Sequence, residues 1–180
     1  MKLGSVRDAI HDATAIHLLN RAGLDPFKYG TRIDKSSFGS ANSIIVDAME
    51  AGRIIGAVES QPEHIRCWLM YAYAAVTDQK YKPPLQVRLF NILFSSRAKR
   101  LKERLLRVCG AAVDDLKMRY NNSRSFEDSY LAIQVGCAES TYNETYKKSL
   151  VGVQKELQRF DSEGLAKVSD VIDELKWGKG

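Results

Sequence analysis

Apolar residues recur every three or four positions along most of this chain, a spacing typical of amphipathic α-helices. The strict alternation that indicates half-buried strands is almost absent. The pattern therefore predicts a mainly α, compact helical protein. The predicted helices cover residues 5–22, 41–52, 60–76, 85–94, 97–116, 125–135, 139–160 and 161–175, and residues 25–40, rich in glycine and serine, are predicted to be a loop.

The segment from Ala132 to Tyr142 has the spacing found at the centre of a helix-turn-helix DNA reader. Ala132 is small enough for two helices to pack closely, and Gly136 supplies the tight turn, where a left-handed backbone would penalise any residue with a Cβ. Thr141 then opens the second helix. This helix, which is expected to begin near Glu139, is long enough both to read DNA and to brace the domain.

The second helix has two distinct faces. Its apolar stripe, expected to pack inward, consists of Tyr142, Tyr146, Leu150, Val153, Leu157 and Phe160. The opposite face carries groups that can reach base edges and phosphates in a major groove. The candidate DNA-binding residues are Ser140, Thr141, Asn143, Glu144, Lys147 and Lys148. The alternative is a surface hairpin with a solvated polar face. The cap position holds Ala138 instead of Ser or Thr, which lowers the stability of the helix start by about 1 kcal/mol and weakens the DNA-reading interpretation.

A run of basic residues precedes this segment on another predicted helix. Between positions 97 and 107 only Glu103 opposes the cations, and Leu101, Leu105, Val108, Ala112 and Leu116 form an apolar stripe beneath them. Such a helix can lie along a phosphate backbone, an acidic protein surface or anionic lipid, or be merely solvated. The candidates for phosphate or RNA-backbone contacts are Arg97, Lys99, Arg100, Arg104, Arg119 and Arg124.

Composition and charge narrow the class of protein. The chain has 180 residues, 44% of them hydrophobic, and a net charge of +5, which favours a nucleic-acid partner for a cytoplasmic protein with no membrane segment. Cys67, Cys109 and Cys137 are odd in number and far apart, so we expect buried free thiols rather than a disulfide framework or a metal site. No cofactor is expected.

An enzyme is the least favoured class. His64 lies three residues before Cys67, a spacing that can bring imidazole and thiol together on a helix, but no third residue completes a nucleophilic site. Asp114 and Asp115 are adjacent, and adjacent helical side chains point about 100° apart. Asp115 with Arg119 is better interpreted as a helical ion pair. We therefore predict that the protein is not an enzyme.

The chain resembles the Q-type transcription antitermination proteins of lambdoid phages. The resemblance rests on the basic, helical layout, on the aromatic segment from Cys67 to Ala74, and on the segment from Ile133 to Tyr142. The lambda-like branch has a cysteine zinc-binding insertion after its aromatic helix, whereas residues 78–84 here contain no cysteine. The match is therefore to the zinc-free, AlpA-like branch, which implies a C-terminal helix-turn-helix of the sigma region 4 type.

This resemblance also implies a mechanism. Such a factor binds a promoter-region DNA element, loads onto RNA polymerase held at a sigma-dependent pause, and extends the RNA exit channel so that nascent RNA passes downstream terminators. Lys28, Arg32, Lys35 and the basic run are candidates to face that RNA. The alternatives are a promoter-binding activator or repressor acting only at initiation, and a basic RNA-binding protein. A second copy on the DNA and a nucleoid location are further expectations.

Three regions follow from these predictions. Residues 1–95 form an N-terminal helical region, residues 96–160 hold the basic helix and the helix-turn-helix, and residues 161–180 form a C-terminal helix.

Overall fold

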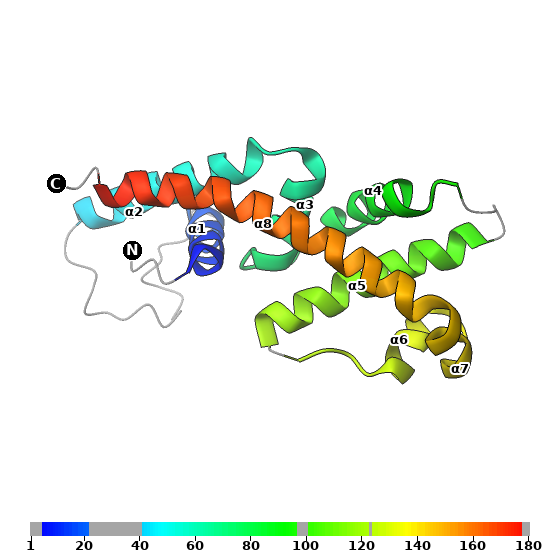
Figure 1. The fold of residues 1–180 in the computed structure, drawn as a ribbon. Helices are drawn as coiled ribbons and strands as arrows, with labels where there is room; N and C mark the ends of the chain where they lie inside the picture. Colours follow the sequence, from blue (N-terminus) through cyan, green and yellow to red (C-terminus); the bar gives the residue numbers. More distant parts are fainter. Residues whose placement is uncertain (1–4, 22–40, 97–100, 123, 178–180) are drawn as a thin grey trace. The chain divides into compact units, whose positions relative to one another are not determined.

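The computed structural model describes residues 5–21, 41–96, 101–122 and 124–177, and the predicted mainly α fold is confirmed (Figure 1). The elements in chain order are α1 (Val6–Arg21), α2 (Ala41–Glu59), α3 (Glu63–Tyr73), η2 (Gln79–Tyr81), α4 (Lys82–Phe94), α5 (Lys102–Asn122), α6 (Asp128–Val135), α7 (Glu139–Thr141), η4 (Tyr142–Tyr146) and α8 (Lys147–Trp177). These described ranges contain no strand. No helix within them is long and apolar enough to cross a membrane. The predicted loop over residues 25–40 lies outside them.

The elements group into two units. Unit 1 contains α1, α2, residues 73–77 and the part of α8 from Gly164 onward. Unit 2 contains α3 up to Ala72, the elements from η2 to η4, and α8 up to Glu163. All described candidate residues for nucleic-acid contact belong to unit 2. The predicted division into residues 1–95, 96–160 and 161–180 stays a prediction.

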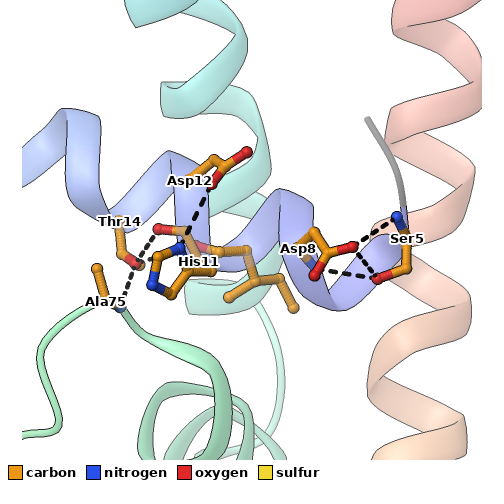
Figure 2. Close-up of polar contacts among 7 residues, drawn as sticks. Ser5, Asp8, His11, Asp12, Thr14 and Ala75 are labelled. Atoms are coloured by element: carbon orange, nitrogen blue, oxygen red, sulfur yellow. Dashed lines mark hydrogen bonds and ion pairs between the residues drawn. The ribbon is translucent and has the colours of Figure 1, made fainter. Parts of the chain in front are cut away.

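Unit 1 begins with a capping box at the start of α1, which Figure 2 shows. The Ser5 hydroxyl accepts a hydrogen bond from the backbone N–H of Asp8, and the Asp8 carboxylate accepts one from the backbone N–H of Ser5, each at 3.1 Å. This exchange satisfies donors that a helix start leaves unpaired. Further along α1, the buried Thr14 hydroxyl accepts the N–H of Ala75 at 2.9 Å, which ties residues 73–77 to the helix.

The second helix of unit 1 is longer than its sequence pattern predicts. The pattern indicates an end near Gly52, whereas α2 continues to Glu59. Glycine inside a helix costs about 1 kcal/mol relative to alanine. Burial of Ile54 and Val58 beyond the glycine outweighs this cost.

The longest element, α8, is one continuous helix where the sequence predicts two. The predicted break at Asp161 is wrong, because α8 runs without interruption from Lys147 to Trp177. Asp161 is buried, and its carboxylate accepts a hydrogen bond from the indole N–H of Trp68 at 2.9 Å. The acidic side chain that resembles a helix cap therefore serves a buried indole instead.

The core of unit 2 lies along α5. Four of the five predicted stripe residues are buried: Leu105, Val108, Ala112 and Leu116. Leu101 is 36% exposed and precedes α5, so its assignment to the stripe is wrong. Gly110 allows close packing against α4, because a Cβ there would lie 2.1 Å from the side-chain nitrogen of Gln86.

The three cysteines all carry free thiols. Cys67 and Cys109 are buried, as predicted, and burial raises the pKa of the Cys109 thiol to about 12. Cys137 is only half-buried, because it lies in the turn that follows α6.

Candidate nucleic-acid interface

The turn after α6 is the tight glycine turn that the sequence predicts. Gly136 has φ +80° and ψ +45°, in the left-handed region. Its N–H donates to the carbonyl of Ile133 at 3.0 Å, and the N–H of Cys137 donates to the carbonyl of Ala132 at 3.1 Å. These two bonds form a Schellman ending, which satisfies the last carbonyls of α6. The assignment of this geometry to a sigma region 4-like DNA-binding module stays a prediction.

The helix after the turn begins at Glu139 and continues through α7, η4 and α8 (Figure 1). Ala138 precedes it with no side-chain cap, as its sequence indicates. The predicted apolar stripe is buried throughout: Tyr142, Tyr146, Leu150, Val153, Leu157 and Phe160. Packing of this stripe replaces the missing cap as the main source of helix stability.

One turn of this helix, η4, is a π-helix. Tyr142 and Tyr146 are buried at its two ends, and the three residues between them, including Asn143 and Glu144, are exposed. Single π-turns inside α-helices are frequent at functional sites. Sequence reasoning missed this feature, because a buried pair four residues apart fits an α-helical turn equally well.

The predicted DNA-binding side chains lie on the surface opposite the buried stripe. Thr141 is half-buried, and the exposed members of the set are Ser140, Asn143, Glu144, Lys147 and Lys148. Lys147 forms an ion pair with Asp128, in the first turn of α6. This pair links the two helices that flank the glycine turn. Contacts of the six residues with DNA stay a prediction.

The start of α5 reaches this same region. A side-chain hydrogen bond with Tyr146 raises the pKa of the exposed Arg104 guanidinium. Arg107 lies against the turn, because a Cβ on Gly136 would be 2.5 Å from one of its guanidinium nitrogens. Arg107 also donates to Glu103 at 2.6 Å. The basic helix and the glycine turn, two separate features of the sequence, are therefore neighbours in unit 2.

A buried carboxylate of α5 connects this helix to α8 and to the segment before α6. Asp115 is fully buried and accepts hydrogen bonds from the Gln154 amide and the Phe126 backbone N–H, both at 2.7 Å. It also pairs with Arg119 at 2.8 Å, which confirms the predicted helical ion pair. Arg119, a phosphate candidate, therefore has a structural partner, and sequence reasoning missed the connection from Asp115 to α8.

The remaining basic candidates separate into two groups. Arg124 is exposed and lines a small pocket with Met118, Ser125 and Phe126. Those that lie outside the described residues are Lys28, Arg32, Lys35, Arg97, Lys99 and Arg100. Contacts of all these residues with phosphate or RNA stay predictions.

His64 and Cys67, the imidazole and thiol considered above for catalysis, lie in surroundings that do not activate a nucleophile. His64 packs edge-on against Phe160, with ring centroids 4.6 Å apart, and burial together with Arg88 lowers its pKa. Burial raises the pKa of the Cys67 thiol, the opposite of what activates a thiolate nucleophile. Among the residues that the structure describes, no cluster of three or more His, Cys, Asp or Glu could hold a metal ion.

Comparison with known proteins identifies a protein family for this chain. The family model described as phage antitermination protein Q matches residues 46–179, which include all of unit 2. No curated protein and no solved structure matches the chain. The family model extends over well more than half of the sequence, and the chain therefore belongs to the phage antitermination protein Q family, whose name indicates regulators that act against termination of transcription.

Proposed function

We propose that this chain is a sequence-specific DNA-binding antitermination factor. It binds a duplex element at or beside a promoter through the exposed face of the helix that begins at Glu139. It then loads onto RNA polymerase paused near the promoter with its sigma factor, and lets the polymerase read through downstream terminators. No covalent chemistry is required of the protein.

The observation that carries this proposal is the division of one helix into two faces. Its apolar side chains are buried, and its hydroxyl, amide, carboxylate and ammonium groups are exposed just after a left-handed glycine turn. These groups match the donors and acceptors of a major groove. Arg104 and Arg107, which lie beside the turn and the helix start, can contact phosphates and fix the orientation of the protein on the duplex.

Family membership supports the later steps. An antitermination protein must act on elongating polymerase, so polymerase, sigma factor and nascent RNA are the proposed partners, and a cytoplasmic, nucleoid-associated location follows. A second copy bound to the same element is a further proposal, because helix-turn-helix proteins often occupy paired half-sites. The zinc-free, AlpA-like character is proposed from the sequence resemblance.

A selection from genomic DNA tests the whole proposal. The purified chain selects fragments of its own source genome, and each recovered fragment is transcribed in vitro through a downstream terminator. We expect one promoter-overlapping site and increased readthrough that needs the site in cis. A site that changes initiation alone would instead identify an ordinary activator or repressor, and RNA binding without any enriched DNA site would identify a basic RNA-binding protein.

Substitutions on the exposed face test the recognition helix. Asn143→Ala and Lys147→Ala are each expected to weaken binding to the selected site by about 1–3 kcal/mol, because they remove base or phosphate contacts. Asn91→Ala and Lys167→Ala change exposed residues of α4 and α8 and serve as matched controls. Since Lys147 also pairs with Asp128, Asp128→Ala shows how much of its effect comes from the ion pair. Unchanged binding by Asn143→Ala would contradict the assignment.

A further inference from the structure

A small pocket lies where the end of α5 is followed by the segment that leads into α6. It has a volume of about 500 Å³ and is lined by Met118, Arg124, Ser125 and Phe126. This volume is within the range of about 300–1,000 Å³ that is usual for small-molecule sites. The lining brings a thioether, an aromatic ring, a hydroxyl and a guanidinium to one place, so the pocket suits a ligand with both an apolar ring and a negative charge.

Two aromatic rings form a platform beside this pocket. The rings of Phe126 and Tyr130 lie with centroids 4.7 Å apart and planes tilted by 39°. Tyr130 is 45% exposed, and Phe126 is half-buried. Rings that are at least partly exposed provide a stacking surface for bases, because every base has a π-face.

The backbone at Phe126 is held in place by a hydrogen bond that needs no ligand. The N–H of Phe126 donates to the buried Asp115 carboxylate at 2.7 Å, and the Gln154 amide donates to the same carboxylate at 2.7 Å. This network connects the pocket wall to α5 and α8. A ligand would therefore meet an ordered wall, and binding costs less when the site is already ordered.

The arginine of the pocket differs in its surroundings from Arg119, five residues earlier in the chain. Arg119 is bonded to Asp115 at 2.8 Å, whereas Arg124 is exposed in the pocket lining. A guanidinium can contact a phosphate with two parallel hydrogen bonds. Arg124 is thus placed to pair with a phosphate while an attached base lies on the aromatic rings.

We propose that this pocket binds one unstacked base of a single-stranded nucleic acid. The base stacks on Phe126 and Tyr130, and its phosphate pairs with Arg124. Stacking is tolerant of base identity, so the site holds a strand without reading its sequence. RNA and an unwound DNA strand share this chemistry. The site is separate from the polar face proposed to read duplex DNA, and it goes beyond that function.

Binding of single strands by the full chain tests the proposal. Labelled 15-nucleotide RNA and DNA of one sequence are titrated with protein, and binding is followed by fluorescence anisotropy. Phe126→Leu and Tyr130→Leu are expected to weaken binding about 5-fold or more, because they remove a stacking surface. Arg124→Gln is expected to lower the slope of log affinity against log salt concentration by about 0.7, the value for one phosphate contact on a single strand.

Matched controls separate this site from general effects. Arg88→Gln removes an exposed arginine of α4, and Ile133→Ala removes an exposed apolar side chain without a ring, so both are expected to leave binding unchanged. Tyr130 and Arg124 are exposed, so their variants keep the test valid even if Phe126→Leu does not fold. Tighter binding of RNA would identify a transcript as the ligand, and tighter binding of DNA an unwound promoter strand.

Two results would overturn the proposal. One is unchanged single-strand affinity in both Tyr130→Leu and Arg124→Gln. The other is that these two variants bind oligonucleotides normally but no longer associate with RNA polymerase. That result would identify the pocket as a contact surface for protein. Failure of the recognition helix is distinguishable, since Asn143→Ala tests duplex binding alone and the pocket variants are measured on single strands.

Discussion

The two ends of α5 use charge in opposite ways. At its start, Lys102, Arg104 and Arg107 are exposed, and the exposed Glu103 is the acid beside them. Toward its end, adjacent carboxylates at Asp114 and Asp115 are largely buried and form several hydrogen bonds. Charges at the start stay in solvent, where a phosphate can replace a carboxylate partner. Charges at the end are part of the packed interior.

The buried end shows how adjacent acids perform different tasks. Their side chains point about 100° apart on the helix. Asp114 accepts hydrogen bonds from the Tyr71 hydroxyl and the Lys82 ammonium, both at 2.7 Å, and so connects α5 to α3 and α4. Asp115 faces α8 and the segment before α6. A shift of one position along the helix thus determines which neighbouring elements a carboxylate binds. The burial of each carboxylate determines how much its hydrogen bonds contribute to stability.

The largest expected effect comes from removing the more buried carboxylate. Asp115→Ala leaves the Gln154 amide and the Phe126 N–H unpaired, and each unsatisfied buried donor costs about 1–3 kcal/mol, so we expect the free energy of unfolding to fall by about 2–5 kcal/mol. Asp114→Ala, at a site whose side chain is 21% exposed, is expected to cost only about 1–2 kcal/mol. Urea denaturation of the two variants measures the difference. Equal losses would show that burial does not separate these acids.

A smaller effect is expected at the turn where the start of α5 lies. Gly136→Ala imposes a left-handed backbone on a residue with a Cβ, which costs about 1–2 kcal/mol. The 2.5 Å approach to Arg107 adds little, because that atom is the end of a flexible side chain. Gly152→Ala in α8 is the control, since outside the neighbouring backbone of its own helix no atom lies within 4 Å of the new Cβ, and it should stabilise by about 1 kcal/mol. Denaturation midpoints that move in the same direction would contradict this distinction.

The features that the sequence predicts well are those with a local cause. Gly136 takes the left-handed turn because few other residues do so cheaply, and the stripe from Tyr142 to Phe160 is buried because its spacing leaves one face apolar. The exposed positions of Asn143 and Lys148 follow from the same spacing. Local conformation and helical period are properties of short segments, so they can be deduced without knowing the fold.

The features that the sequence does not predict depend on distant partners. Asp161 resembles a helix start, but Trp68, far away in the chain, provides its hydrogen bond within a continuous helix. The α5–α8 connection through Asp115 and Gln154 has the same character. Nothing in a linear pattern specifies which residues meet across a core. For the same reason the sequence does not predict the pocket beside Phe126. It shows only that Arg124 and an aromatic residue stand two positions apart.

At the exposed end of α5, substitution should change binding rather than folding. Arg104→Ala is expected to lower the slope of log duplex affinity against log salt concentration by about 0.9, the contribution of one phosphate contact on B-DNA. The free energy of unfolding should fall by no more than the contribution of one hydrogen bond, because the exposed Arg104 loses only its bond with Tyr146. Lys167→Ala in α8 removes another exposed cation, which belongs to unit 1, and is the matched control. A salt slope equal to that of the unmodified protein would assign Arg104 to a solvated role.

The smallest expected effect comes from the acid beside these cations. Glu103 accepts a hydrogen bond from Arg107 at 2.6 Å, in an exposed pair that contributes about 0.2–1 kcal/mol to stability. Glu103→Gln removes one negative charge and leaves Arg107 able to contact a phosphate, so duplex affinity should rise about 2- to 5-fold at low salt and less at high salt. Glu163→Gln removes an exposed acid that pairs with Arg159, away from the basic helix in sequence, and should leave affinity unchanged. Weaker duplex binding by Glu103→Gln would show instead that Glu103 holds the Arg107 side chain in the position from which it contacts DNA. The ion pair at the start of α5 would then have a structural role, as the carboxylates toward the end of α5 do.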